Sequence, residues 1–196
     1  TGIDLLVCSL PMNVLMLTGY CPVVGASIAL ADRNGDFALV VPADEQELAE
    51  ESWADEIIPF EAGSLHRLVS VAEAACAALR KAFESLQFKS GVIGIEGGGY
   101  SEPAPYVGLH LYSGTLEWLV SQSIADPKYK PAGEMLSQLR SVKTRAEVEH
   151  IRSACGLAET AYRAVHEKIA PGLTEKEAAA LGSAALSLCA GNARCE

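Results

Sequence analysis

Short apolar runs separated by polar turns fill the first 130 residues, a pattern typical of a sheet with helices packed on it. The runs that predict strands are 4–8, 27–31, 37–41, 56–60, 92–96 and 115–120. The segments between them predict helices over 11–17, 43–52, 64–83 and 103–112. Strands and helices that intermix in this way predict an α/β domain with a mixed sheet.

The clearest local signal is a turn between two of the predicted strands. Residues 32–36 read Asp-Arg-Asn-Gly-Asp and separate two apolar runs. The pair Asn34-Gly35 tolerates the positive φ angles that a tight hairpin turn requires. The pattern therefore predicts a β-hairpin, and at least one antiparallel pair in the sheet.

Beyond residue 131 the pattern changes to helices alone. The Pro- and Lys-containing stretch 126–131 predicts a linker, and 132–140 predicts a short helix. Thr144 then lies three residues before Glu147, the capping-box spacing that opens a helix. An apolar seam at helical spacing follows, formed by Val148, Ile151, Cys155, Ala158, Tyr162, Val165 and Ile169.

A second capping box, Thr174 with Glu177, predicts another helix that ends near Leu188. These two long helices have no sheet of their own to cover. One chain alone cannot bury their apolar faces, so we expect the chain either to self-associate or to have a mobile carboxy-terminal part. The patterns divide the chain into an α/β domain over 1–130 and a helical part over 131–196.

The charge follows the same division. Residues 1–130 carry 7 Lys or Arg against 17 Asp or Glu, whereas residues 131–196 carry 8 against 8. An acidic surface repels phosphate backbones, so nucleic acid is not an expected partner. No apolar run reaches the ~18–20 residues that cross a bilayer, and no signal peptide is visible, so no membrane association is expected.

The cysteine pattern bears on the compartment. The six cysteines are scattered with no C-x-x-C pair, and several occupy apolar positions of predicted elements, where a reduced thiol acts as a small hydrophobe. The simplest interpretation is a reduced, cytoplasmic protein. The six positions are Cys8, Cys21, Cys76, Cys155, Cys189 and Cys195.

Residue chemistry alone assigns no catalytic or metal-binding residue. No cysteine or serine lies in a nucleophile elbow. Glu147 and His150 have the spacing of half a di-iron motif, but a second half is missing, so a solvated helix face is the better interpretation. Gly94–Gly99 lacks the order of a phosphate-binding loop and indicates a flexible turn. The acidic cluster of Glu45, Glu47, Glu50 and Glu51 indicates a charged helix face.

Several short motifs are informative when their order and spacing are considered together. They are Pro11–Tyr20 (PMNVLMLTGY), Ile93–Glu96 (IGIE), Leu139–Thr144 (LRSVKT) with Glu147–Ala154 (EVEHIRSA), and Pro171–Glu177 (PGLTEKE). In this order and spacing they resemble the pita-bread metallopeptidase family of Xaa-Pro aminopeptidases, prolidases and creatinase. The resemblance covers essentially the whole chain.

The resemblance implies a creatinase-like amino-terminal domain over 1–130, followed by the opening helices of a truncated pita-bread domain over 131–196. A full-length parent would hold two divalent metal ions, manganese, cobalt or zinc, with two Asp, one His and two Glu, and would hydrolyse a peptide substrate. Those ligands would follow residue 177, and 178–196 contains no Asp or His. No metal ligand or cofactor is therefore expected in this chain, and the chain alone is expected to be inactive.

The resemblance also implies a homo-oligomer, such as a dimer, whose amino-terminal domain limits access to a neighbouring active site. The loop after the Leu-Thr-Gly segment, with Tyr20, Pro22, Val23 and Val24, is the candidate substrate-access loop; a plain connection between helix and strand is the competing interpretation. Two other functions stay open. They are a creatinase-like hydrolase of small C–N compounds and a non-catalytic homologue that binds peptides or proteins.

Overall fold

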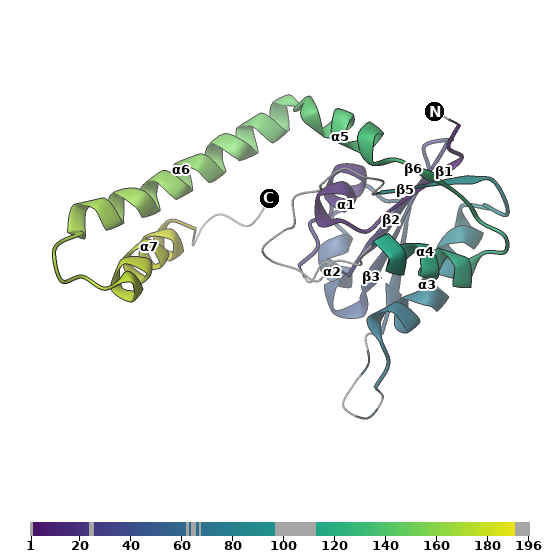
Figure 1. Ribbon diagram of the computed structural model, residues 1–196, viewed down its shortest axis with the longest axis horizontal. Coiled ribbons are helices and arrows are strands. Elements are labelled where there is room, and N and C mark those ends of the chain that lie inside the picture. The colour runs from purple at the N-terminus through teal and green to yellow at the C-terminus, as the bar shows by residue number, and fades with distance from the viewer. Residues whose placement is uncertain are drawn as a thin grey trace. The chain divides into compact units, whose positions relative to one another are not determined.

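The chain forms two compact units, Thr1–Arg140 (unit 1) and Ser141–Glu196 (unit 2). The computed structural model describes residues 2–23, 26–61, 63, 66, 68–96 and 113–190. Unit 1 holds all the described strands, and unit 2 is helical (Figure 1).

A six-stranded mixed sheet forms the centre of unit 1, in the order β4-β3-β2-β1-β5-β6. Only β2 runs against its neighbours, because it pairs antiparallel with β1 and β3 while the remaining pairs are parallel. This arrangement confirms the predicted α/β fold with a mixed sheet and a hairpin. The strands are β1 Leu5–Cys8, β2 Ile28–Asp32, β3 Phe37–Pro42, β4 Glu56–Phe60, β5 Val92–Ile95 and β6 Lys128–Pro131.

Helices cover both faces of the sheet. Helices α3 and α4 lie side by side on one face, and α1 and α5 pack on the other (Figure 1). A 3₁₀ turn at Ala43–Glu45 leads into the short helix α2 after β3. The helices of unit 1 are α1 Pro11–Thr18, α2 Gln46–Ala49, α3 Val71–Ser85, α4 Ser113–Ser123 and α5 Gly133–Ser141.

The alternation of side chains along β1 separates the two cores. Leu5 and Val7 are buried against α3 and α4, whereas Leu6 and Cys8 face the α5 side. Successive strand residues point to opposite faces of a sheet, so a four-residue run that is apolar throughout is buried on both. This explains why the strand carries no polar position.

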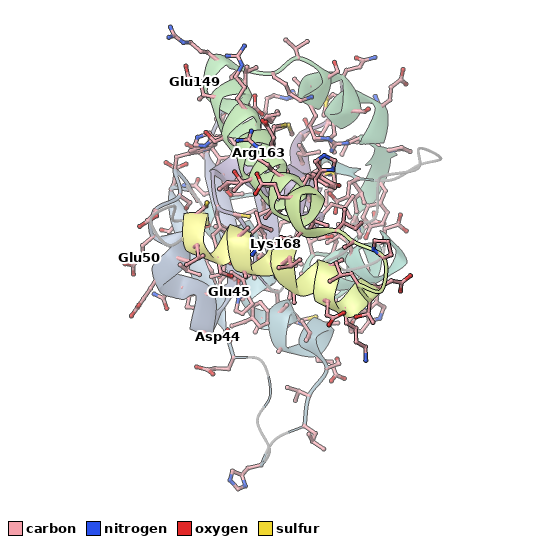
Figure 2. The ribbon with its side chains drawn as sticks, turned by 90° about the vertical axis from the view of Figure 1, so that its left-hand side faces the viewer. Asp44, Glu45, Glu50, Glu149, Arg163 and Lys168 are labelled. Atoms are coloured by element: carbon pink, nitrogen blue, oxygen red, sulfur yellow. The ribbon has the colours of Figure 1, made fainter. Side chains whose placement is uncertain are left out.

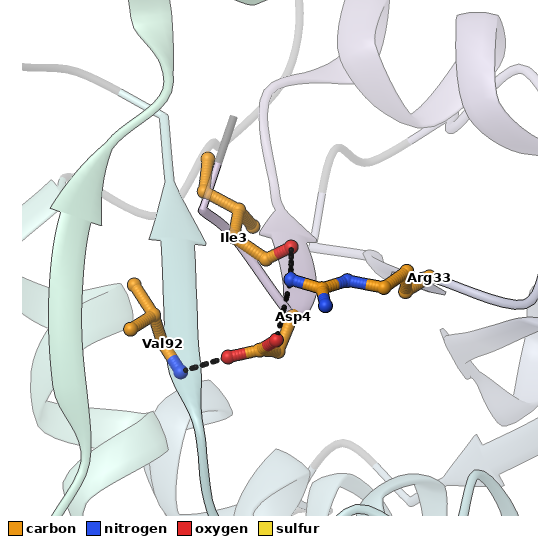
Figure 3. Close-up of polar contacts among 4 residues, drawn as sticks. All are labelled: Ile3, Asp4, Arg33 and Val92. Carbon is orange, nitrogen blue, oxygen red and sulfur yellow. Dashed lines mark hydrogen bonds and ion pairs between the residues drawn. The ribbon is translucent and has the colours of Figure 1, made fainter.

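One carboxylate connects separate parts of the sheet at the end where β1 and β5 begin (Figure 3). The Asp4 side chain accepts a 2.8 Å hydrogen bond from the Val92 backbone N–H at the start of β5. Its other oxygen lies 2.7 Å from the Arg33 guanidinium, which also donates to the Ile3 carbonyl at 3.2 Å. Asp4 thereby connects the start of β1 to β5 and to the turn between β2 and β3.

Two element predictions were wrong. Residues 115–120 belong to helix α4, because Leu116, Leu119 and Val120 are buried at helical spacing. The long helix starts at Val71, not at residue 64, since Ser70 forms a capping box with Glu73. Leu68, which lies within the predicted helix range, is 91% exposed. The helix predicted over 103–112 lies outside the described residues.

The predicted linker at 126–131 was also wrong. Its last four residues form β6, an edge strand whose side chains are all exposed. Pro and Lys suit an edge strand, which needs only one hydrogen-bonded side and gains protection from pairing with other chains. Unit 1 continues through α5 to Arg140, so the structural division lies ten residues beyond the expected one at Lys130.

Unit 2 is a pair of helices, α6 Arg145–Lys168 and α7 Glu175–Ala190, both opened by the predicted capping boxes. The helices approach closely at Gly182, where an added Cβ would lie 3.4 Å from the Val165 methyl group. No residue of α6 is buried, and its exposed residues include Ile151 and Tyr162. Among the described helices none is long and apolar enough to cross a membrane.

Candidate functional site

The predicted access loop starts where α1 ends, at a tightly packed glycine. Gly19 has a φ of 73° and closes the helix with a backbone hydrogen bond to the Leu15 carbonyl. The ring of Trp53 lies directly over it, and its indole N–H donates to the Leu17 carbonyl at 2.7 Å. The Trp53 backbone N–H donates to the Thr18 carbonyl at 2.9 Å. Trp53 therefore occupies two of the carbonyls that the end of a helix leaves without partners.

The next residue fixes the loop from inside. The Tyr20 ring is buried in the core formed by α1, β2 and β3, and its hydroxyl donates to the Glu45 carboxylate. The same carboxylate oxygen accepts from the Val23 backbone N–H at 2.9 Å. The buried Glu45 carboxylate thus binds both Tyr20 and Val23, and this anchors the loop segment between them.

The predicted loop residues differ in what they can offer a partner. Tyr20 is 3% exposed and serves as the anchor. Pro22 is half-buried, whereas Val23 is 59% exposed and, like the exposed Cys21, can be touched by an external molecule. Val24 lies outside the described residues.

The structure corrects the interpretation of Glu45 as part of a charged helix face. Glu45 is 4% exposed, whereas its neighbours Asp44 and Glu50 are exposed (Figure 2). The 3₁₀ turn that ends at Glu45 directs this side chain inward, where Tyr20 and Val23 supply hydrogen bonds. The acidic run 44–51 therefore contains one structural carboxylate among solvated ones.

The anchor predicts a dependence on alkaline pH. Burial, and next the hydrogen bond to Glu45, raise the pKa of Tyr20 well above its usual 10. Since the folded protein holds this proton more tightly than the unfolded chain, stability from Tyr20 is complete below pH 10 and is lost as the pH rises above it. We expect the free energy of unfolding to fall more steeply between pH 10 and 11 in the wild type than in Tyr20→Phe. Parallel slopes in urea titrations would contradict this.

A second buried carboxylate, Glu96, lies after the end of β5 and beside the start of α1. One oxygen accepts from the Ser9 backbone N–H at 2.5 Å, the Ser9 hydroxyl at 2.7 Å and the Leu10 N–H at 2.7 Å. The other accepts from the Asn13 side-chain amide at 2.7 Å. All four groups are donors, which is the surrounding that an ionised carboxylate requires.

In the sequence Glu96 and Asn13 belong to two separate motifs, and nothing in either motif predicts that the two side chains meet. Asn13 is fully buried and also accepts a hydrogen bond from the Arg140 guanidinium. The three residues thus come from three of the segments that carry the family resemblance. The feature of the sequence that could have revealed these contacts is a polar residue at a defined position within an apolar segment.

The remaining candidate residues show no catalytic or metal-binding arrangement within the described part of the chain. Glu147 accepts from the backbone N–H of Thr144, and His150 is exposed, so the solvated helix face is confirmed. Burial raises the pKa of the Cys76 thiol, which makes it a poor nucleophile. Gly97–Gly99 lie outside the described residues. Within the described ranges, no group of three or more His, Cys, Asp or Glu could hold a metal ion.

Two shallow hollows lie on unit 1. The first, about 340 Å³, lies between the ends of α3 and α4, where Arg80 is bound to the Gln122 carbonyl at 2.9 Å. The second, about 420 Å³, lies next to Asp4 and Arg33, whose charges pair with each other. Neither hollow aims a nucleophile or a metal-ligand set at a bound molecule, and the anchored loop remains the best candidate for a functional element.

Comparison with known proteins identifies relatives of the chain. The Xaa-Pro dipeptidase of Pyrococcus furiosus is 26% identical to the chain over 184 residues, which are 91% of the chain and 42% of the dipeptidase. The chain is homologous to the Xaa-Pro dipeptidases. No family model matches it. The chain spans less than half the length of this dipeptidase.

Solved structures of Xaa-Pro dipeptidases and prolidases share the fold. The prolidase from Pyrococcus horikoshii is 25% identical with a TM-score of 0.64, over 95% of this chain and 45% of that one. The N-terminal domain of the Xaa-Pro dipeptidase from Lactobacillus brevis is 16% identical with a TM-score of 0.50, over 69% of this chain and 88% of the domain. The second match shows that unit 1 has the fold of the amino-terminal domain in the Xaa-Pro dipeptidases.

Proposed function

We propose that this chain is the amino-terminal part of a metal-dependent Xaa-Pro hydrolase, and that unit 1 serves oligomer assembly and restricts access of substrate. The observation that carries the proposal is the homology to Xaa-Pro dipeptidases over nearly the whole chain. The chain matches less than half of the Pyrococcus furiosus dipeptidase, so the proposal assigns the two-metal site and the peptide-bond chemistry to the part of such enzymes that this chain does not match.

The anchored loop supports a role in access. Val23 is exposed, yet its backbone is held by Glu45, and the preceding turn is held by Trp53. A loop that limits the size of a substrate must keep its place when a peptide meets it, which requires such attachments. A plain connection between a helix and a strand needs neither.

Unit 2 offers a further surface for assembly, in addition to the role proposed for unit 1. Helix α6 exposes the apolar residues Ile151 and Tyr162, and it also carries an exposed ion pair between Arg163 and Glu159. A helix with an apolar face normally buries that face against another element. In the proposal, α6 packs against the catalytic part of the protein or against a second copy of the chain.

The isolated chain is expected to bind no pair of metal ions and to hydrolyse no Xaa-Pro dipeptide. The measurements are a calorimetric titration with Mn²⁺, Co²⁺ or Zn²⁺ and an assay of proline release with the metal present. A control is the purified Pyrococcus furiosus dipeptidase under the same conditions. A two-metal isotherm or turnover by the chain would contradict the proposal.

The access role is tested in a protein that joins this chain to a catalytic part. Val23→Ser should change the ratio of kcat/KM for an Xaa-Pro dipeptide to that for a longer Xaa-Pro peptide. The control is Leu68→Ser, which removes another exposed apolar side chain, from a different loop of unit 1. If both variants leave the ratio unchanged while activity persists, the loop is only a connection. If a protein with the complete sequence binds peptides without cleaving them, it is a non-catalytic homologue.

A further inference from the structure

Three polar residues from distant parts of unit 1 form one buried chain of hydrogen bonds. Asn13 lies 83 residues from Glu96 and 127 residues from Arg140 in the sequence. Its amide nitrogen donates to Glu96, and its amide oxygen accepts from Arg140, so both ends of the amide are engaged. This fixes the orientation of the amide and links the cation to the carboxylate.

The first member of this chain also holds the start of α1. Glu96 accepts the backbone N–H groups of Ser9 and Leu10, which precede the first helical residue, Pro11. The first N–H groups of a helix have no partners inside it, and a carboxylate is the ligand they favour. Glu96 therefore fixes where α1 begins and the direction in which it leaves β1.

The last member is the final residue of unit 1. Arg140 lies in the last turn of α5, and unit 2 starts at Ser141. The other end of α5 is attached as well, because the Ala132 backbone N–H donates to the Ile95 carbonyl at 2.8 Å. Between the two attachments, Leu136 is buried against Leu6 and Cys8. The helix is thus fixed to the sheet along its whole length.

We propose that Glu96, Asn13 and Arg140 form a clamp that sets the position at which the chain leaves unit 1. The clamp joins α5 to the start of α1, and the other end of α1 carries the anchored loop. One short helix therefore connects the candidate access loop to the exit of the chain. Arg140 is a positioning residue in this scheme, since it acts on Asn13.

The chemistry of the clamp explains why the cation is Arg. A guanidinium is planar, stays charged and presents several N–H donors in fixed directions, whereas a lysine ammonium is a compact, strongly hydrated charge. Arg140 is half-buried, so its charge acts on the buried carboxylate with less screening than a solvated one. Arg140→Lys should therefore retain only part of the effect.

Hydrogen exchange of the full 196-residue chain tests the clamp. In Arg140→Gln, amide exchange should speed up about tenfold in the last turn of α5 and the first turn of α1, because a charge-assisted hydrogen bond is lost there. Exchange in β2 and β3 should stay unchanged. The control is Arg80→Gln, which removes another guanidinium that donates to a backbone carbonyl, on the opposite face of the sheet.

Arg140→Lys distinguishes positioning from mere charge. An intermediate exchange rate at both helix ends supports the clamp. Two results would overturn it: equal exchange in Arg140→Gln and the wild type at these ends, or a uniform acceleration over the whole sheet. The uniform result would mean that Arg140 contributes to general stability and does not position the exit of the chain.

A double-mutant cycle gives an independent readout. The effects of Asn13→Ala and Arg140→Gln on the rate of exchange at the end of α5 should not multiply, because Arg140 acts through Asn13. Fully multiplicative effects would show that the two residues act separately and would overturn the proposal. The test depends on unit 1 alone, so its result is distinct from any result on peptide hydrolysis.

Discussion

Replacing Glu96 with Gln should lower the free energy of unfolding by about 2–4 kcal/mol, although the two side chains have the same size. The Glu96 oxygens accept four hydrogen bonds, from the Ser9 N–H and hydroxyl, the Leu10 N–H and the Asn13 amide. A glutamine presents one acceptor oxygen and one NH₂ group, which would face donors. At least one buried donor then loses its partner.

Urea denaturation of the full chain, followed by circular dichroism, measures this loss as a lower midpoint at constant slope. The matched control is Glu84→Gln, which makes the same chemical change at an exposed position of α3 and should alter stability by less than about 0.5 kcal/mol. Equal stability of the two variants would mean that the carboxylate is not the charged acceptor that its surroundings indicate.

Local signals predicted the elements of the fold that local interactions form. The turn with Asn34-Gly35 fixes the hairpin by its own backbone preference, and Asp32 accepts from the backbone N–H groups of Asn34 and Asp36. The capping boxes at Thr144 and Thr174 likewise involve residues three positions apart. Such features need no information from the rest of the chain.

The errors lie where distant parts of the chain decide the outcome. Residues 128–131 form a strand because β5 offers a free edge, and their own composition indicates a linker. Leu116, Leu119 and Val120 fit either a short apolar strand or one face of a helix, and packing on α3 selects the helix. Short apolar runs are ambiguous by periodicity alone.

The candidate site likewise has features that the local sequence predicts and features that depend on distant residues. The loop after α1 was found because Gly19 ends a helix that a proline begins. Its anchor was missed because β2 and β3 separate Tyr20 from Glu45 in the sequence. The pairing of these two strands brings the Tyr20 hydroxyl to Glu45. Glu96 was missed for the same reason, because its partners lie more than 80 residues away.

Gly19→Ala should destabilise unit 1 by about 2–3 kcal/mol and release the access loop. Two effects add. An alanine at a φ of 73° is strained, and its Cβ would lie 2.3 Å from Cζ3 of the Trp53 ring. The ring must move away, and the hydrogen bond from its indole N–H to the Leu17 carbonyl is then lost.

The control for the backbone strain is Gly35→Ala. Gly35 has a φ of 93° in the hairpin turn, and no atom lies within 4 Å of an added Cβ. This variant should cost only about 1 kcal/mol, so the difference between the two glycines measures the contact with Trp53. Equal losses of stability would mean that the indole adapts without cost.

The variant Trp53→Ala separates the backbone strain at Gly19 from the contact of its added Cβ with the Trp53 ring. In Trp53→Ala the ring is absent, so Gly19→Ala should then cost no more than Gly35→Ala does in the wild type. Proteolysis within 20–23 should become faster in Gly19→Ala at the same temperature, because the turn that leads into the loop loses its attachment to Trp53. If cleavage there does not change although stability falls, the indole stabilises the helix end without holding the loop.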